Sequence, residues 1–348
     1  MFALGEGKTS GVAMPRRSPI DAAGQAAGRP RPGMTMTAAH PDHDGFHHLA
    51  FLYRSGQEYL ATLLAFARAG IARGEPVFVA VPGPAGEDLR DRLAPGAGQV
   101  IFADMARMGL NPARIIPAVR AFIDAHPGRR VRYIGEPAWP GRSADELRET
   151  ARHEALINSA FRDAPATILC PYDTTALAPS VIADAWRTHP VMLRQGREEV
   201  SPEYPGPGGV PPDCDAPLPA PPARAAWLRY TANLRSIRDL VASHAAQAGL
   251  TSGRGADLVL AVSEIAANTL RHTRDGGTLH VWRTPDSLIC QLHDQGRITD
   301  PLAGRRRPAL DVLGGQGLWV VNQVCDLVEL RSGRTGTTVR LQMRLHPA

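Results

Sequence analysis

Two polar residues stand one helical turn apart in the last third of the chain. Glu264 and Asn268 lie in the run SEIAANTLRH, residues 263–272, whose apolar spacing predicts a helix. Positions i and i+4 share one face of a helix, so both side chains point the same way. Taken alone, each residue is more often solvated surface than site. Together they offer an uncharged oxygen ligand for Mg²⁺ and a carboxylate that could take a proton from an attacking hydroxyl.

Three further motifs follow in the order expected of one nucleotide site. They are Asp294 and Gly296 in the run HDQG, Gly314, Gly315 and Gly317 in the run GGQGL, and Gly336 to Thr338 in the run GTT. A buried carboxylate accepts a hydrogen bond from the amino group of adenine, and a glycine beside it lets the backbone approach the base. Glycines before a helix expose N–H groups at its positive end, which suits phosphates. Each motif alone is commonly a turn or a loop, and it is their joint order that predicts nucleotide binding.

The order E-x-x-x-N, D-x-G, G-x-G-L and G-T-T resembles the GHKL ATPase superfamily, which includes histidine kinases, heat-shock chaperone ATPases, gyrase B and MutL. Residues 224–348 most resemble anti-sigma regulatory factors of the RsbW and SpoIIAB type. These relatives are serine kinases that phosphorylate a small antagonist protein and bind a sigma factor in turn. The resemblance implies an α+β two-layer sandwich (the Bergerat or GHKL fold), ATP and Mg²⁺ as cofactors, and homodimers among the relatives. It implies these site residues: Glu264 as catalytic base, Asn268 as Mg²⁺ ligand, Asp294 as adenine contact, and Gly296, Gly315, Gly317 and Thr338 lining the pocket.

Two features depart from the relatives. This domain contains no lysine, so a cation at the phosphates would be an arginine, either Arg271 or one of Arg305 to Arg307. The first predicted helix also lacks a phosphoacceptor histidine, because His244 in ASHAAQAG has neither the flanking acidic residue nor the proline of a histidine kinase. The first departure leaves catalytic competence open but not nucleotide binding. The second argues against a histidine kinase.

Residues 44–195 alternate predicted strands with predicted helices. The runs HHLAFLY, PVFVAVP, QVIFAD, RVRYIGEPAW and ATILCPYD indicate strands. The segments between them have helical spacing, and Ser143 three residues before Glu146 forms a capping box. This alternation predicts an α/β domain with a mainly parallel sheet.

The same region resembles the MEDS domain, a sensory module named from methanogens, methylotrophs and the DcmR regulator. The runs that carry the resemblance are HHLAFLY, EPVFVAVP, RYIGEPAWPG, HEALINSAF and ILCPYD. It implies a RecA-like α/β fold without a working phosphate loop, and a small, hydrocarbon-like ligand. Polar residues beside apolar elements are candidate ligand contacts, and for each of them ordinary capping or surface polarity is an equal alternative: His48, Tyr53, Glu136, Glu154 and Asn158. Roles for Cys170 and Asp173 are weaker, since a buried cysteine near a strand end is usually core.

Composition bounds the rest of the chain. Residues 1–43 are rich in Gly, Ala, Pro and Arg, which predicts disorder, and residues 196–223 are a proline-rich linker between two domains. The N-terminus lacks the apolar core of a signal peptide and no run is long enough to span a membrane, so we expect a cytoplasmic protein. A net charge of +5 with one short basic cluster gives no reason to expect nucleic-acid binding. The four cysteines lack CxxC spacing, so we expect neither a disulfide framework nor a zinc site.

Four functions remain after this reading. The first is a cytoplasmic regulator whose sensory domain controls a GHKL-type serine/threonine protein kinase. That kinase would phosphorylate an antagonist protein of the STAS type or sequester a sigma factor. The second is a non-catalytic ATP-binding module that sequesters a partner, and the third is a sensor histidine kinase-like protein. A metabolic enzyme comes last, because no nucleophile–base set is legible in the first domain.

Overall fold

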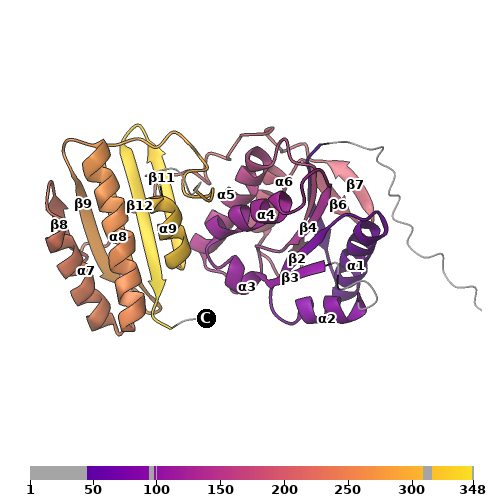
Figure 1. The fold of residues 1–348 in the computed structure, drawn as a ribbon, viewed down its shortest axis with the longest axis horizontal. Coiled ribbons are helices and arrows are strands. Elements are labelled where there is room, and N and C mark those ends of the chain that lie inside the picture. Colours follow the sequence, from indigo (N-terminus) through magenta and orange to yellow (C-terminus); the bar gives the residue numbers. More distant parts are fainter. Residues whose placement is uncertain (1–44, 94–97, 99, 309–315, 347–348) are drawn as a thin grey trace, which may run out of the picture. The chain divides into compact units, whose positions relative to one another are not determined.

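The computed structural model of the chain describes residues 45–93, 98, 100–308 and 316–346. These residues belong to the compact unit formed by residues 36–348. They contain two separate β-sheets, each with its own helices (Figure 1). The extension predicted to be disordered, residues 1–43, lies outside the described residues.

The first sheet has seven strands in the order β3-β2-β4-β5-β1-β6-β7. The strands are β1 (His47–Tyr53), β2 (Val77–Val81), β3 (Val100–Asp104), β4 (Val131–Gly135), β5 (Ala166–Asp173), β6 (Val191–Arg194) and β7 (Arg197–Val200). The helices are α1 (Gly56–Ala72), α2 (Ala85–Arg92), α3 (Met105–Met108), α4 (Ile115–Asp124), α5 (Ala144–Ala160) and α6 (Pro179–Thr188), with a 3₁₀ turn at Pro112–Arg114. All strand pairs are parallel except β6–β7. The prediction of a mainly parallel sheet is confirmed.

Helices cover this sheet on both faces, and the strand sequences explain why. In β1, Leu49 and Phe51 pack into the apolar cluster that contains α1 and α2 residues. Ala50 and Leu52 pack into the cluster that contains α4, α5 and α6 residues. Successive side chains of a strand point to opposite faces, so a continuous apolar run fits a sheet buried on both sides. The predicted capping box of Ser143 and Glu146 is present at the start of α5.

The segment predicted to be a linker is partly built into the protein. Strand β7 lies at the start of the range 196–223 and pairs with β6, so the first sheet continues to Val200. Beyond it, Asp215 pairs with Arg152 at 2.7 Å, and the carbonyl groups of Ala216 and Pro219 accept hydrogen bonds from Arg331 and Arg340. The proline-rich segment therefore contacts the folded parts of the chain through an ion pair and hydrogen bonds.

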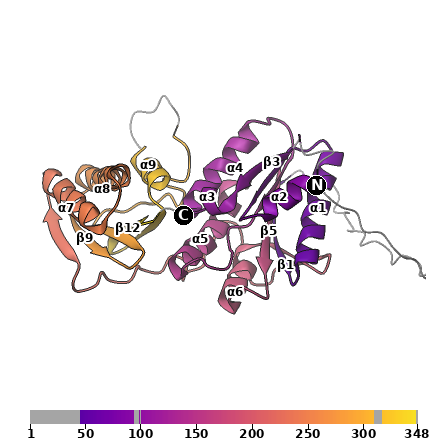
Figure 2. The same cartoon turned by 90° about the horizontal axis from the view of Figure 1, so that it is seen from below.

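The second sheet has five strands in the order β11-β12-β10-β9-β8, all antiparallel. The strands are β8 (Ala226–Tyr230), β9 (Gly277–Arg283), β10 (Ser287–Asp294), β11 (Leu327–Gly333) and β12 (Gly336–Arg344). Helices α7 (Arg235–Ala248), α8 (Ser252–His272) and α9 (Gly317–Val324) cover one face (Figures 1 and 2). The predicted α+β two-layer arrangement is thus present, and β8 is a strand that the sequence did not reveal.

Strand alternation defines which residues face the helices. Leu288, Cys290 and Leu292 of β10 pack into the apolar cluster shared with α7, α8 and α9, and Val339 and Leu341 of β12 do the same. The residues between them face the other side. The same alternation determines which polar residues at the ends of the strands face the helical layer.

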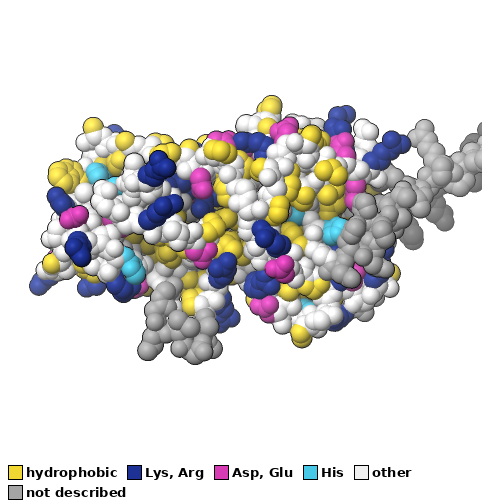
Figure 3. Space-filling view, turned by 90° about the horizontal axis from the view of Figure 1, so that it is seen from above, with side chains coloured by type: hydrophobic (Ala, Val, Ile, Leu, Met, Phe, Trp, Pro, Cys, Tyr) yellow, Lys and Arg dark blue, Asp and Glu magenta, His cyan; other side chains and the backbone are white. Residues whose placement is uncertain are grey.

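Among the helices that the structure describes, none combines the length and the apolar character that a membrane span needs. On the face of the described residues drawn in Figure 3, basic side chains are dispersed among acidic and apolar ones. That face therefore carries no continuous basic band among the residues that the figure colours.

Candidate functional site

Helix α8 holds the first motif. Thr251 caps its start by accepting a hydrogen bond from the backbone N–H of Arg254. Apolar residues such as Leu258 and Ile265 are buried, whereas Glu264 and Asn268 are partly exposed, one turn apart. Asn268 Oδ1 accepts a hydrogen bond of 2.9 Å from Arg271. Glu264 makes no hydrogen bond or ion pair with any of the described residues. Its carboxylate is therefore available for a ligand, and its predicted role as catalytic base stays a prediction.

Gly317 brings the third motif against this pair. It is the first residue of α9, and a Cβ placed on it would lie 2.7 Å from Glu264 Oε2 and 3.3 Å from Asn268 Nδ2. Only glycine leaves both side chains where they are. The free backbone N–H groups at the start of α9 therefore lie beside Glu264 and Asn268. Gly315, which was predicted to line the same pocket, and Gly314 of the same motif lie outside the described residues.

Asp294 and Gly296 join the site through the neighbouring threonine of α8. Asp294 Oδ1 accepts from the backbone N–H of Gly296 at 2.7 Å, and Oδ2 accepts from the hydroxyl of Thr269 at 2.6 Å. A Cβ on Gly296 would lie 2.9 Å from Asp294 Oδ1, so a side chain there would displace the Asp294 carboxylate. Thr269 directly follows Asn268, and the second motif is thereby linked to the first.

The glycine–threonine motif contributes a different threonine from the predicted one. Thr337 pairs with Asp294 across the sheet, and its hydroxyl donates to the carbonyl group of Gly296 at 2.9 Å. Thr338 pairs with His293 and makes a hydrogen bond of 3.0 Å to its ring. Since Asp294 faces the helices, Thr338 faces the other side of the sheet. The structure does not bring Thr338 to the site. Strand alternation from Val339 and Leu341 would have identified Thr337 instead.

The far end of α9 is held by the first domain. Arg114 Nε donates to the carbonyl oxygen of Asn322 at 2.8 Å, and its Nη2 donates to that of Cys325 at 2.6 Å. Asn111 also donates to the carbonyl oxygen of Asn322, at 3.1 Å. The last carbonyl groups of a helix have no partner within the helix, and a cationic side chain there also matches the helix dipole. Helix α9 thus joins the first domain at one end to Glu264 at the other.

The segment after β10 is also anchored in the first domain. Leu302 is buried in the apolar cluster that contains α4, α5 and α6 residues. Arg305 is buried and pairs with Glu149 of α5 at 3.1 Å, and Arg331 of β11 pairs with the same carboxylate at 2.6 Å. Arg305 was one of the arginines predicted to contact the phosphates, but in the structure its side chain forms an ion pair with Glu149. Arg271 remains beside Asn268.

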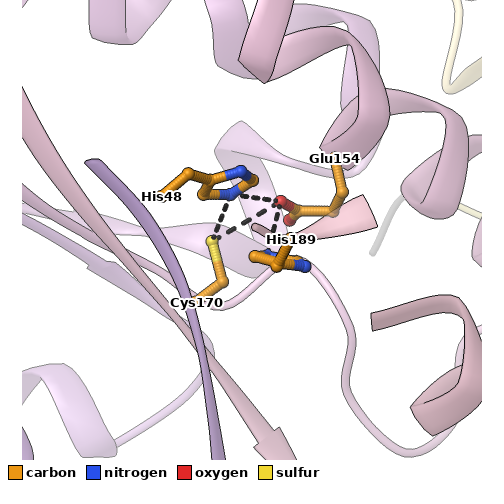
Figure 4. Close-up of side chains that lie close together, drawn as sticks. All are labelled: His48, Glu154, Cys170 and His189. Carbon is orange, nitrogen blue, oxygen red and sulfur yellow. Dashed lines mark hydrogen bonds and ion pairs between the residues drawn. The ribbon is translucent and has the colours of Figure 1, made fainter. Parts of the chain in front are cut away.

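Three of the predicted sensory residues form one buried cluster (Figure 4). His48 Nδ1 lies 3.1 Å from Asn158 Oδ1, and His48 Nε2 lies 3.0 Å from Glu154 Oε2. Burial, with a contribution from nearby His189, lowers the pKa of His48 to about 4. Burial alone would raise the pKa of Glu154, but its contacts with His189 and His48 outweigh this and lower it. His189 was not identified from the sequence, and Cys170 was given a weak role. Both lie beside the same carboxylate.

The other two predicted residues form a second cluster. Glu136 follows β4, and its carboxylate accepts hydrogen bonds from Tyr59 at 2.7 Å and from Tyr53 at 3.3 Å. Burial raises the pKa of Glu136 from 4.5 to about 7, although the tyrosine hydroxyls act in the opposite direction. Tyr59 of α1 was not predicted.

A separate cavity of about 560 Å³ lies in the first domain, far in the sequence from Glu264 and Asn268. Residues around the carboxyl ends of β1 and β5 and the β6–β7 hairpin line it, among them Arg54, Thr174, Trp186 and Arg194. Ligands of α/β sheets commonly bind at the carboxyl ends of the strands, and this volume suits a small molecule. None of the five predicted contacts lines this cavity.

Comparisons with known families agree with this division of the chain. The family described as the methanogen/methylotroph, DcmR sensory domain (MEDS) matches residues 47–190. The family described as the histidine kinase-like ATPase domain matches residues 228–343. The chain therefore carries a MEDS domain followed by a histidine kinase-like ATPase domain, and both predicted resemblances are confirmed. A sensory domain joined to such an ATPase domain makes the chain a signalling regulator, and the ATPase family implies ATP binding.

No curated protein matches the chain significantly. Among solved structures, the chain is similar to the RsbU and RsbW domains of a Mycobacterium tuberculosis protein. The identity is 20% and the TM-score is 0.28, over 36% of this chain and 34% of that one. The chain thus spans about a third of that structure, and a likeness of this size defines neither substrate nor partner.

Proposed function

We propose that the ATPase domain is a serine/threonine protein kinase of the anti-sigma-factor type, controlled by the MEDS domain. The observation that carries this proposal is the contact of Gly317 with both Glu264 and Asn268. It brings a free carboxylate, the Asn268 amide and a helix N-terminus together, and the amide oxygen, which accepts a hydrogen bond from Arg271, would have to turn to a metal ion for phosphoryl transfer from Mg²⁺–ATP. Asp294, linked through Thr269, adds a carboxylate suited to adenine.

Each residue has one role in the proposed reaction. Asn268 would be the protein ligand of Mg²⁺, and the bound ATP would supply the phosphoryl group and leave as ADP. Glu264 accepts the proton of the attacking serine or threonine hydroxyl. The N-terminus of α9 holds the phosphates, with Arg271 as the cationic side chain nearest to Asn268. Thr337 positions the turn at Gly296, where the base approaches.

The MEDS domain controls this site through α9 and the segment after β10. Arg114 and Asn111 hold the C-terminal end of α9, whose first residue touches Glu264. Leu302 and Arg305 anchor the segment that precedes α9. A ligand that shifts the first domain by a fraction of an ångström would therefore move α9 against Glu264, and catalytic geometry is sensitive to displacements of that size.

The proposed partners follow from the kinase type. One is a STAS-type antagonist protein, which would accept the phosphate. The other is a sigma factor, which the ATPase domain would bind and which the unphosphorylated antagonist would release from it. The proposed ligand of the MEDS domain is a small molecule, for which the cavity beside Arg54 and Trp186 has the right size. The alternative is a domain that binds ATP without transfer and acts by sequestering its partner. The free carboxylate of Glu264 favours the kinase.

Transfer of labelled γ-phosphate tests the proposal. The full-length chain is incubated with Mg²⁺, labelled ATP and each STAS-type protein of the same genome, and the acceptor residue is then identified. Phosphoserine or phosphothreonine on an acceptor, lost in Glu264→Gln, supports the kinase. ATP binding without transfer to any acceptor supports the sequestering alternative. Acid-labile phosphate on this chain itself would contradict both and indicate a histidine kinase.

A further inference from the structure

Four side chains of metal-binding type converge inside the MEDS domain. They are His48 of β1, Glu154 of α5, Cys170 of β5 and His189, which follows α6 (Figure 4). One ligand atom from each lies within 4.8 Å of all the others. None of the four residues is more than 1% exposed. Four segments that are distant in the sequence therefore meet at one point away from solvent.

In each of the two histidines, the ring nitrogen Nδ1 already has a hydrogen-bond partner outside the cluster. Asn158 Nδ2 donates to the carbonyl group of Thr188 at 2.8 Å, so its Oδ1 is left as the acceptor for His48 Nδ1. His189 Nδ1 lies 3.0 Å from the carbonyl oxygen of Ala185, which can only accept. Both rings therefore carry their proton on Nδ1. In a neutral imidazole the other nitrogen is then an unprotonated acceptor.

Both of these Nε2 atoms face the same carboxylate oxygen, Glu154 Oε2. His48 Nε2 lies 3.0 Å from it and His189 Nε2 lies 3.3 Å from it. The contact of His189 lacks hydrogen-bond geometry, and Glu154 Oε1 has no partner among the described residues. Neutral imidazoles would place two lone pairs against a negative oxygen, which is unfavourable in a buried site. A positive charge between them removes the conflict.

The distances match those around a tetrahedral metal ion. Bonds of about 2.0–2.1 Å to nitrogen and oxygen and about 2.3 Å to sulfur place N and O ligands about 3.3 Å apart and N and S ligands about 3.6 Å apart. The observed N–O separations are 3.0 and 3.3 Å. Cys170 Sγ lies 3.5 Å from His48 Nε2 and 3.5 Å from Glu154 Oε2. All pairs of ligand atoms lie within 4.8 Å, so an ion would draw the farthest pair together by up to about 1.5 Å.

We propose that His48, Glu154, Cys170 and His189 bind one divalent transition-metal ion of the Zn²⁺ type. Binding releases the thiol proton of Cys170, and the thiolate and the Glu154 carboxylate then neutralise the two positive charges. Asn158 and the carbonyl group of Ala185 orient the two rings, as the outer partners of metal-bound histidines commonly do. Four protein ligands and complete burial define a structural site rather than one open to substrate. The proposed site departs from the expectation of no zinc site, which rested on the lack of CxxC spacing, because these ligands come from separate elements.

The site is adjacent to the contacts with the ATPase domain. Glu154 lies on α5, the helix that carries Glu149, and Glu149 pairs with Arg305 and Arg331. A metal ion bound to Glu154 would fix α5 relative to β1 and β5. The test of metal binding is nevertheless independent of the test of kinase activity, because the metal content is measured on the protein without ATP.

Metal content and a cobalt spectrum test the proposal. The full-length chain is expressed in medium supplemented with Zn²⁺ or Co²⁺, because a buried site exchanges slowly, and is purified without chelator. We expect about one equivalent of metal per chain, and for Co²⁺ the intense visible bands of a tetrahedral site together with a thiolate charge-transfer band. Cys170→Ser should abolish the thiolate band, and His189→Gln should lower the metal content at least tenfold. Cys290→Ser removes another buried cysteine and should change neither.

Two results would overturn the proposal. One is a folded wild-type chain that contains less than a tenth of an equivalent of metal after growth in either medium. The other is a Co²⁺ spectrum of the wild type without a thiolate band, which would place any bound metal elsewhere. Because both are read on the wild-type protein, they decide the question even where Cys170→Ser or His189→Gln does not fold.

Discussion

Replacing Gly317 by alanine separates the catalytic geometry from the stability of the fold. The added Cβ would lie 2.7 Å from Glu264 Oε2 and 3.3 Å from Asn268 Nδ2. Carbon and oxygen atoms pack best at about 3.5 Å, so the carboxylate must move by about 0.8 Å. The end of a glutamate side chain can move that far by rotating, and Gly317 does not have a positive φ that alanine would resist.

The expected effects on rate and stability differ in size. A displacement of about 1 Å at a catalytic group can cost about 100-fold in rate, and we expect the phosphotransfer rate of Gly317→Ala to fall by about that factor. Stability should change by less than about 1 kcal/mol, because alanine favours the helical and folded states by about 0.5–1 kcal/mol and so offsets the cost of the shifted side chain.

Phosphotransfer to an acceptor and thermal unfolding are measured on the same preparations. Gly253→Ala is the matched control, since Gly253 also lies in the first turn of a helix and a Cβ there meets nothing within 4 Å. It should leave the rate unchanged. A Gly317→Ala protein that keeps its rate within about threefold of the wild type, or a control that loses as much, would refute the proposed role of this contact.

Four further substitutions test other parts of the structure. Burial holds the pKa of Glu136 at about 7 in the folded chain against 4.5, so this residue stabilises the fold below pH 4.5 and loses that effect as the pH rises through 7. As the pH rises from 4.5 to 7, the unfolding free energy of Glu136→Gln should increase by up to about 3 kcal/mol relative to the wild type, measured by denaturant titration. A difference between the two proteins that does not change with pH would contradict this. Glu149→Gln leaves two buried arginines without their carboxylate and should destabilise the chain by about 3–5 kcal/mol in the same assay. Arg114→Ala frees the C-terminal end of α9 and should change the phosphotransfer rate at least threefold while leaving the helix content unchanged by circular dichroism. Thr337→Val should weaken ATP binding, measured by calorimetry, by about 1 kcal/mol, whereas Thr338→Val should not. The reverse order would show that Thr338, and not Thr337, lies on the nucleotide side of β12.

The proximity of most residues of the candidate nucleotide site was predictable because their motifs are short and local. Glu264 and Asn268 share a helix face by spacing alone, and a side chain at Gly317 or Gly296 would displace the carboxylate beside it. It is harder to predict from the sequence which side of a sheet a residue near the end of a strand faces. Thr338 was chosen over Thr337 because the register of β12 follows only from which of its apolar residues are buried.

Long-range contacts were not predictable. The buried cluster of the MEDS domain needs His189, which is separated in the sequence from both His48 and Glu154 and carries no local motif. Glu149 and Arg114 read as ordinary helix residues, yet each contacts the other domain across more than 150 positions. The sequence also assigned residues 196–200 to the linker, because two short strands at a sheet edge leave little periodic signal.

Calorimetry of Mg²⁺-dependent ATP binding tests whether Glu264, Asn268 and Gly317 form a nucleotide site. Titration calorimetry is performed on the full-length wild type and on Asn268→Ala, with and without Mg²⁺. We predict one site per chain whose affinity requires Mg²⁺ in the wild type and falls at least tenfold in Asn268→Ala, while the melting temperature without nucleotide stays the same. A wild-type chain that binds no ATP in Mg²⁺, or an Asn268→Ala chain that binds it equally well, would contradict the account.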